Sequence, residues 1–438
     1  MSRQVGLFLF KNDLRIHDNL ALATAAAEVD QLICIYCLEP KQPPSSLRAP
    51  SNLSPHRQLF LQQSLTDLHR SLKHLGQQLM VTNDSPLDII PQLITQHNIG
   101  HIYCSEAAGY YERQTWQRLI KRYPFIGFKS ITTHTLFEMA ELPFSIAELP
   151  DSFSKFRKLT EHLSIKLPQP KLASMPPSPA TFISWPDPSL IKIDNTLFEG
   201  GEQRALTHVE NYFNSELAST YKETRNGLDG MDYSTKFSPW LANGCLSARQ
   251  ILQVLHTYEH HRGANDSTYW IYFELLWREY YQFYAHRHGK KLFSFSGLKL
   301  AKPATSFYPE RFQKWCNGNT PYPIVNAFMK QLNSTGYMSN RGRQLVASCF
   351  VHELGLNWRY GASYMEQQLV DYDVASNWGN WQYLAGVGAD PRGHRRFNLT
   401  KQTQIYDPKG DFIKKWGGDN YDSQLDSVDA ADWPISWS

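Results

Sequence analysis

The stretch VGLFLFKNDLRIHDNLALATAAAEVDQLICIYCL (residues 5–38) decides the fold of the first part of this chain. It begins and ends with short apolar runs, residues 5–10 and 31–38, and such runs are typical of buried strands. Residues 19–28, which lie between them, have the pattern of a helix. When a helix connects two neighbouring strands, the strands usually run parallel to each other. This stretch therefore predicts the first unit of a parallel sheet.

The same alternation of strands and helices continues to about residue 135. Further strands are expected within residues 77–82, 101–106 and 128–133. We therefore predict an α/β doubly wound parallel-sheet domain over residues 1–135, in which ligands lie beyond the carboxyl ends of the strands. No G-x-G-x-x-G motif follows the first strand, so a dinucleotide bound to this sheet is not supported.

The rest of the chain has a different pattern. Prolines accumulate from residue 143 to residue 199, which predicts an irregular but packed connector over residues 136–200. From residue 201 onward the apolar residues follow the helical period, as in EQRALTHVENYFNSEL and SNRGRQLVASCFVHEL. We predict an all-α domain over residues 201–438 with a short C-terminal extension.

Composition narrows the class of protein. The 438 residues suffice for two or three domains, and the formal net charge of +3 permits a nucleic-acid partner without requiring one. The 6 cysteines and 16 histidines show no ligand spacing, so neither a metal site nor a disulfide framework is expected. Cys34 and Cys37 fall in one expected strand and should face opposite sides of it. The sequence shows neither a signal-peptide pattern nor a membrane-spanning run, so we expect a cytoplasmic protein. We also expect a monomer or a weak dimer.

A first cluster with chemical potential lies in YSTKFSPWLANGCLS (residues 233–247). It places the hydroxyls of Ser234, Thr235 and Ser238 around Lys236, just before an expected helix. Free N–H groups at a helix start, short hydroxyls and a lysine suit an anionic phosphate. The alternative is ordinary N-capping, which also favours Ser and Thr at such a position.

A second cluster lies in YWIYFELLWREYY (residues 269–281). Helical spacing puts Trp270, Glu274, Trp277 and Arg278 on one face. An acid flanked by tryptophans is unusual on a buried face, because an unpaired carboxylate is costly to bury. The alternative is a plain Glu274–Arg278 ion pair on a half-exposed helix.

A third cluster combines Asn340 and Arg343, one helical turn apart, with the acids of LVDYDVASNWGNWQY (residues 369–383). Arg343 could pair with Asp371 or Asp373, and a buried pair of this kind is costly unless both groups also contact a polar ligand. Together the three clusters suit a large dinucleotide with a redox-active ring, held among helices.

A local basic patch follows in ADPRGHRRFN (residues 389–398). Its cationic members are Arg392, His394, Arg395 and Arg396. Such a patch suits a nucleic-acid backbone, and a solvated surface loop is the alternative.

These motifs bear a family resemblance. FKNDLRIHDN, STKFSPWLANGCLSARQ, ELLWREYY, QLNSTGYMSNRGRQ and LVDYDVASNWGNWQY resemble, in order, the motifs of the photolyase/cryptochrome flavoproteins. GVGADPR, RRFN and KQTQIYDPKGDFIKKW resemble the DASH-type cryptochromes in particular. The resemblance runs nearly from end to end.

The resemblance implies FAD bound within the helical domain. The residues that it places around the cofactor are Tyr221, Ser234, Thr235, Lys236, Phe237, Ser238, Asn340, Arg343, Asp371, Asp373 and Asn377. Arg343 with Asp373 is expected to form a polarised pair beside the flavin ring, and Asn377 is expected to reach its N5 atom.

The resemblance also implies an electron relay. Trp381 and Trp358 match the inner two members of the family's tryptophan relay. The outer member is not evident, and Phe307 or Tyr308 stands near its usual place. Core packing is the alternative role for each tryptophan.

The implied activity is that of a deoxyribodipyrimidine photo-lyase, which repairs cyclobutane pyrimidine dimers by electron transfer from excited, reduced FAD. Glu274 is expected to hydrogen-bond the flipped-out dimer, and Trp277 and Tyr383 to contact its rings. Tyr383 and Gln344 depart from ordinary photolyases, match the DASH pattern and make the pocket more polar, which fits a preference for single-stranded DNA, or RNA. The residues expected to contact the nucleic acid are Arg341, Arg392, His394 and Arg395.

Two further expectations follow from the resemblance. Glu106 matches a position that holds a folate in relatives, so 5,10-methenyltetrahydrofolate is expected as an antenna, although a polar residue at a strand end is the alternative. The rival function is a blue-light photoreceptor that signals by flavin photoreduction, and the short acidic segment after Trp416 weakens it. A third candidate function is a nucleic-acid-binding module without turnover, which would keep the arginines but would need neither Asn377 nor Glu274.

Overall fold

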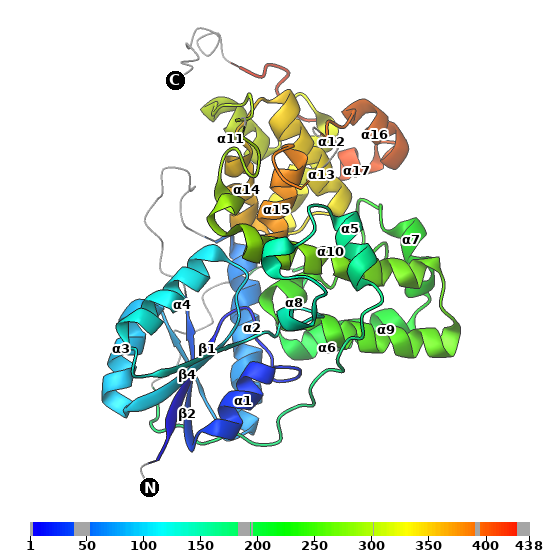
Figure 1. Ribbon diagram of the computed structural model, residues 1–438. Coiled ribbons are helices and arrows are strands. Elements are labelled where there is room, and N and C mark those ends of the chain that lie inside the picture. Colours follow the sequence, from blue (N-terminus) through cyan, green and yellow to red (C-terminus); the bar gives the residue numbers. More distant parts are fainter. Residues whose placement is uncertain are drawn as a thin grey trace.

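The computed structural model describes residues 3–38, 53–182, 193, 196–300, 302–389 and 395–426. A five-stranded parallel sheet forms the N-terminal part, and helices form the C-terminal part beside it (Figure 1). The fold class predicted from the sequence is confirmed. In the described part of the chain, no helix is both long enough and apolar enough to cross a bilayer.

The sheet has the strand order β3-β2-β1-β4-β5. Its strands are β1 (Val5–Phe10), β2 (Gln31–Cys37), β3 (Leu79–Thr82), β4 (Ile99–Ser105) and β5 (Gly127–Ile131). The helices between them are α1 (Leu20–Glu28), α2 (Pro55–His74), α3 (Pro86–His97) and α4 (Tyr110–Arg122). All four pairings are parallel, as helical crossovers require.

The sheet is covered on both faces. Leu32 and Cys34 belong to the core that includes α1 and α2, whereas Ile33, Ile35 and Cys37 belong to the core that includes α3 and α4. Alternate residues of β2 therefore face opposite layers, and the prediction for the two thiols is confirmed.

The connector differs from the sequence prediction in one respect. It contains α5 (Phe153–Thr160), whereas an irregular segment was expected. Ser152 stands at the N-cap, and Phe153, Phe156 and Thr160 are buried at helical spacing, so a short amphipathic helix forms despite the flanking prolines. The connector is packed on the sheet domain, since the Gln77 side chain donates to the carbonyl of Pro176 at 2.8 Å.

The C-terminal part is helical. Its helices are α6 (Glu202–Asn214), α7 (Tyr221–Thr224), α8 (Ser238–Asn243), α9 (Ala248–Arg262), α10 (Asp266–His288), α11 (Pro309–Asn317), α12 (Pro323–Thr335), α13 (Asn340–Ser348), α14 (Trp358–Gln368), α15 (Val374–Leu384), α16 (Leu399–Tyr406) and α17 (Asp411–Lys415). The long α10 packs against α15 and α7, and α14 packs against α15. These contacts, together with that of α13 against α15, bring the motifs on α10, α13 and α15 into one region of the fold (Figure 1).

A buried arginine joins the two parts. Arg15 is 1% exposed and follows β1. Its guanidinium donates to the carbonyls of Gly244 at 2.9 Å, Asp18 at 2.9 Å and Thr133 at 2.7 Å. Gly244 adopts the left-handed φ of +69°, and a Cβ there would lie 1.8 Å from the carbonyl oxygen of Asn12. The loop after β1 and the end of α8 therefore lie so close together that only glycine fits at position 244.

Replacing Arg15 with Met should lower the free energy of unfolding by about 3 kcal/mol, because it leaves three backbone carbonyls without a donor in a buried seam. Urea unfolding followed by circular dichroism measures the change. Arg70→Met is the matched control, because the Arg70 side chain is 67% exposed and should change stability by less than about 0.5 kcal/mol. Equal effects of the two substitutions would show that the seam does not depend on Arg15.

Candidate functional site

Lys236 is a buried cation at the start of α8. It is 2% exposed, and its backbone has a left-handed φ of +55° although it is not glycine. Its Nζ lies 3.2 Å from the centre of the Tyr233 ring and 4.9 Å from that of Tyr337. Among the described residues no carboxylate lies within ion-pairing distance of this amine, and burial lowers its pKa to about 7. Strain together with an unpaired buried amine points to an anionic ligand.

The residues beside Lys236 in the chain are consistent with an anionic ligand. Phe237 stands at the N-cap of α8 and makes no side-chain capping bond, so capping does not explain the hydroxyls nearby. Phe237 and Tyr221 are buried, whereas Ser234, Thr235 and Ser238 are partly exposed. The hydroxyl residues that the sequence singled out are therefore partly accessible and flank a buried lysine in the chain.

Arg343, from α13, forms an ion pair with Asp371. Its Nη2 lies 2.7 Å from Oδ2 of Asp371, and its Nε donates to the carbonyl of Met338 at 3.0 Å. Burial lowers the pKa of Arg343, but the adjacent carboxylate outweighs it and the net pKa is raised. Oδ1 of Asp371 is buried and has no hydrogen-bond partner among the described residues. A buried, half-satisfied carboxylate of this kind calls for a polar ligand.

The expected Arg343–Asp373 pair is wrong. Oδ1 of Asp373 accepts from the backbone N–H of Ser376 at 2.7 Å, and Oδ2 accepts from Nε2 of Gln282 at 2.9 Å. Asp373 is thus the N-cap of α15, and both of its oxygens are engaged. Asp371, two residues earlier, is the acid that faces Arg343.

Tyr337 links the lysine to the arginine pair. Its ring centre is 4.9 Å from Nζ of Lys236 and 5.5 Å from Cζ of Arg343. Tyr337 was not predicted as a site residue, although it lies only three residues before Asn340 in the sequence. One buried region therefore holds two cations, one carboxylate and an aromatic bridge.

The two amides of the predicted site lie on α15 and at the start of α13. Asn377, in the first turns of α15, donates from Nδ2 to the carbonyl of Ala362 at 3.0 Å, which leaves its side-chain oxygen as an acceptor. Asn340 begins α13, one turn before Arg343, and is exposed.

A second polar cluster lies on α10 around Glu274. The Glu274 side chain is 34% exposed and is ion-paired with Arg225, whose guanidinium lies 4.3 Å from the ring centre of Trp270. Burial raises the pKa of Glu274, and Arg225 opposes that shift. Arg225 was not predicted as the partner of Glu274, because the two residues are 49 positions apart in the chain.

The alternative Glu274–Arg278 pair is wrong. Nη1 of Arg278 donates to the carbonyl of His134 at 2.5 Å and lies 3.7 Å from Glu279. Arg278 therefore faces the N-terminal part rather than Glu274.

Aromatic and cationic side chains extend the Glu274 cluster. Trp277 stacks on Phe153 at 3.8 Å and lies 6.2 Å from Tyr383, over which Arg395 is placed at 4.3 Å. On the other side, Arg341 donates to Gln344 at 3.0 Å and to Asn226, the neighbour of Arg225, at 3.0 Å. Arg392 and His394 lie outside the described residues.

The predicted relay residues are buried. Trp358 begins α14 and is 0% exposed, and Trp381 in α15 is 2% exposed. A Cβ on Gly361, one turn after Trp358, would lie 2.3 Å from the Trp381 ring, so this ring packs directly on α14. Phe307 is partly exposed and stacks on Tyr360 at 4.1 Å.

Glu106 follows β4, at the carboxyl edge of the sheet. Its Oε2 accepts from the hydroxyl of Thr132 at 3.0 Å, and its backbone N–H donates to Ile131. Among the described residues no group of three His, Cys, Asp or Glu side chains could hold a metal ion.

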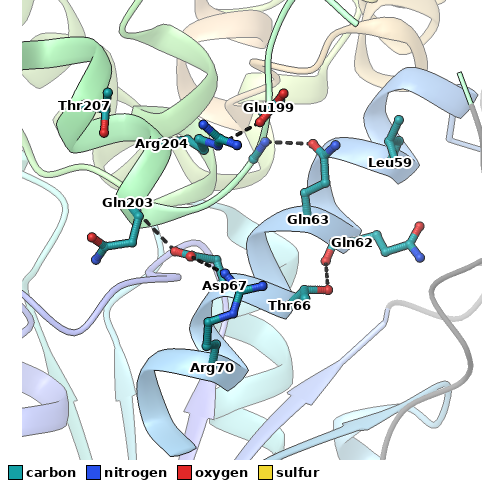
Figure 2. Close-up of a pocket in the computed structure, with 11 residues that line it drawn as sticks. Leu59, Gln62, Gln63, Thr66, Asp67, Arg70, Glu199, Gln203, Arg204 and Thr207 are labelled. Carbon is teal, nitrogen blue, oxygen red and sulfur yellow. Dashed lines mark hydrogen bonds and ion pairs between the residues drawn. The ribbon is translucent and has the colours of Figure 1, made fainter. Parts of the chain in front are cut away.

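A cavity of about 460 Å³ lies elsewhere, between α2 and α6 (Figure 2). Arg204 and Glu199 pair at 2.7 Å on its α6 side, and Oδ2 of Asp67 in α2 accepts from the backbone N–H of Gln203 at 3.2 Å. Its polar groups are thus largely paired with one another, and none of the predicted site residues lines it.

Two family models match this chain. A model described as DNA photolyase matches residues 6–175, and one described as the FAD binding domain of DNA photolyase matches residues 270–422. The second range contains most of α10 and all of α13, α14 and α15, which carry Glu274, Arg343 and Asn377.

Known proteins are similar over nearly the whole chain. A cryptochrome DASH from Idiomarina loihiensis is 56% identical, with 99% of this chain and 97% of the relative covered. One from Vibrio parahaemolyticus is 51% identical, with 100% and 98% covered. A crystal structure of a Synechocystis cryptochrome has a TM-score of 0.89 at 42% identity, covering 95% of this chain and 89% of that one. A class III photolyase from Agrobacterium tumefaciens has a TM-score of 0.80 at 25% identity, covering 95% and 87%.

Proposed function

This chain belongs to the cryptochrome DASH family of photolyase-related flavoproteins, and from that membership we propose that it repairs cyclobutane pyrimidine dimers in DNA with blue light, preferentially in single strands. Its C-terminal part is an FAD-binding domain. The observation that carries the proposal is the Glu274–Arg225–Trp270 cluster, which presents a half-exposed acid beside Trp277 on the same helix.

The residues present fit FAD. Lys236 offers an unpaired buried amine to a diphosphate, and the orphaned Oδ1 of Asp371 offers an acceptor to a flavin N–H. Arg343 would hold negative charge on the ring, while the neutral Asn377 accepts or donates without adding charge. When bound, FAD supplies the photoexcited electron donor for repair.

Glu274 is suited to act on the substrate. Burial raises the pKa of Glu274 while Arg225 opposes the shift, so the carboxyl takes up a proton more readily than an exposed acid does and could share it with a thymine carbonyl as negative charge develops there. Arg225 holds the carboxyl in place and stacks on Trp270. Trp277 and Tyr383 would contact the dimer rings, and Arg341 and Arg395 would neutralise phosphates on either side.

The single-strand preference follows from the cost of extracting the dimer. Flipping a base pair out of a duplex costs a few kcal/mol, whereas an unpaired strand avoids most of this cost. Tyr383 and the Arg341-bound Gln344 give the pocket polar groups and little stacking surface. A pocket of this kind recovers too little energy to open a duplex.

The test is light-driven repair of defined oligonucleotides. Purified protein with reduced FAD is illuminated with a thymine dimer in single-stranded or in duplex DNA, and remaining dimers are counted by chromatography. Loss of the dimer in the single strand, with much slower loss in the duplex, supports the proposal. No loss in either substrate refutes catalysis and favours the rival photoreceptor function.

Replacing Glu274 with Ala should slow repair by about tenfold or more while FAD content stays unchanged, because the substitution removes a hydrogen bond to a developing charge. Quantum yield of repair and the flavin-to-protein ratio measure the two effects. Asp266→Ala is the matched control, since Asp266 is an exposed acid on the same helix, paired with Lys222. Loss of flavin from the Glu274 variant would show that Glu274 serves the cofactor instead.

We also propose that Glu106 holds a folate antenna. The carboxyl lies at the carboxyl edge of the parallel sheet, where ligands of such sheets bind. Glu106→Gln should abolish folate absorbance in protein reconstituted with 5,10-methenyltetrahydrofolate and leave FAD bound. Undiminished folate binding would show that Glu106 is only a polar residue at the end of a strand and does not hold the folate.

A further inference from the structure

Three tryptophans meet where α14 and α15 cross. Trp378 and Trp381 are one turn apart in α15, and Trp358 and Gly361 are one turn apart in α14. Trp381 packs on Gly361, and the Trp378 ring centre lies 5.8 Å from that of Trp358. Trp378 is therefore next to the second of the proposed relay residues.

The indole N–H groups have different acceptors. Nε1 of Trp378 donates to Oε2 of Glu366 at 3.1 Å and to the hydroxyl of Tyr372 at 3.3 Å. Nε1 of Trp358 donates to the backbone carbonyl of Phe295 at 3.0 Å. A carboxylate can accept a proton outright, whereas a backbone carbonyl can only share one.

We propose that Trp378 is the outer member of the electron relay and that Glu366 takes its indole proton. The inference rests on the proposed relay through Trp381 and Trp358. The oxidant is the photoexcited, oxidised flavin. One electron passes from Trp381 to the flavin, one from Trp358 to Trp381, and one from Trp378 to Trp358. Trp378 is left as a radical cation.

The proton transfer makes this last step persist. An oxidised indole is a far stronger acid than a neutral one, so the N–H proton of Trp378 moves to the Glu366 carboxylate. The products are a neutral indole radical and a carboxylic acid, and the electron on the flavin balances the one lost. Return of that electron then requires return of the proton, which slows recombination.

Charged groups also surround Tyr372, the second acceptor of the Trp378 N–H. Burial raises the pKa of the adjacent Tyr372 phenol, and the nearby Glu366 and Glu112 carboxylates raise it further. Arg57, whose guanidinium lies 4.6 Å from the Tyr372 ring centre, partly opposes them. The acid in contact with the Trp378 nitrogen is Glu366, and a carboxylate at 3.1 Å favours a positive charge on the indole.

Two other aromatic residues could be considered for the outer position of the relay, but each lacks either an easily oxidised ring or a carboxylate beside its nitrogen. Phe307, near the usual outer position, has a ring that is hard to oxidise and stacks on Tyr360. Trp315 lies 6.2 Å from Trp381, but its Nε1 donates to the carbonyl of Val346 at 3.1 Å. Of the described tryptophans near the relay, Trp378 combines ring contact with a carboxylate on its nitrogen.

Transient absorption of the FAD-loaded protein tests the proposal. Trp378→Phe keeps an aromatic ring but removes the oxidisable indole, so the yield of long-lived tryptophanyl radical should fall roughly tenfold. Glu366→Gln keeps a hydrogen-bond acceptor but not a base, so the radical should form, remain a cation and decay roughly tenfold faster. In the wild type, heavy water should slow conversion of the cation to the neutral radical.

The controls separate the outcomes. Trp416→Phe removes a tryptophan bound to Asp229 and should leave radical yield unchanged. Tyr360→Phe tests the rival exit. The proposal is overturned if Trp378→Phe behaves as Trp416→Phe does, or if Tyr360→Phe abolishes the radical. If the Trp378→Phe variant fails to bind FAD, the Glu366→Gln variant decides the question: a faster decay of the tryptophan cation radical supports the proposal, and an unchanged decay overturns it. Dimer repair with chemically reduced flavin does not use the relay, so failure of the repair assay leaves this test unaffected.

Discussion

Replacing Arg343 with Met is expected to lower the free energy of unfolding by about 3–5 kcal/mol, because a buried carboxylate loses its partner. Oδ1 of Asp371 already has no partner among the described residues, and Oδ2 would then lose the guanidinium at 2.7 Å. FAD should also fail to copurify, since the flavin would face an uncompensated negative charge. Urea unfolding of the apoprotein and the flavin-to-protein ratio measure the two effects.

The double variant Arg343→Met with Asp371→Asn separates stability from binding. It removes both charges at similar volume, so stability should return to within about 1 kcal/mol of the wild type, since apolar or neutral replacements of buried pairs are often tolerated. FAD binding should stay weak, because neither charged contact is restored. A double variant as unstable as the single one would show that Arg343 acts through packing rather than through its charge.

Replacing Lys236 with Met is expected to have opposite effects on stability and on binding. The apoprotein should become more stable, because an unpaired buried amine is replaced by an apolar side chain of similar length. The dissociation constant for FAD should rise by about 100-fold, the equivalent of one charge-assisted contact worth about 3 kcal/mol. Flavin fluorescence titration measures the constant. Lower apoprotein stability in the variant would show that the amine already has a partner.

The pKa of Lys236 also predicts how FAD binding depends on pH. Burial lowers the pKa of this amine in the apoprotein to about 7, far below its ordinary value. The diphosphate favours the charged amine, so affinity should be highest below pH 7 and fall by up to about tenfold per pH unit above it. Apoprotein stability should change in the opposite sense, because the unfolded chain binds the proton more tightly and this destabilising contribution disappears as pH rises from about 7 toward the ordinary lysine pKa. The Lys236→Met variant should show neither trend.

The fold could be predicted from the sequence because each element carries its own pattern. The strand VGLFLF and the helical period after residue 201 are local signals, and packing did not overrule them. The helix α5 was missed because prolines on both sides concealed the apolar spacing of Phe153 and Phe156. Hydrophobic period therefore predicted the layers, and flanking composition obscured a short helix.

The partners within the site could be predicted only in part. Arg343 was expected to meet an acid, but the choice between Asp371 and Asp373 depends on where α15 begins, and a boundary of this kind is set by capping. Glu274 was identified, whereas Arg225 was missed because its partner is distant in the chain. Tertiary packing, rather than local spacing, turned Arg278 toward His134.

A crystal structure of the FAD-loaded protein would show where the cofactor lies. We expect the flavin ring within hydrogen-bonding distance of Asn377 and of the Arg343–Asp371 pair, with the diphosphate at Lys236. A flavin ring found elsewhere, for example in the cavity between α2 and α6 shown in Figure 2, would contradict it.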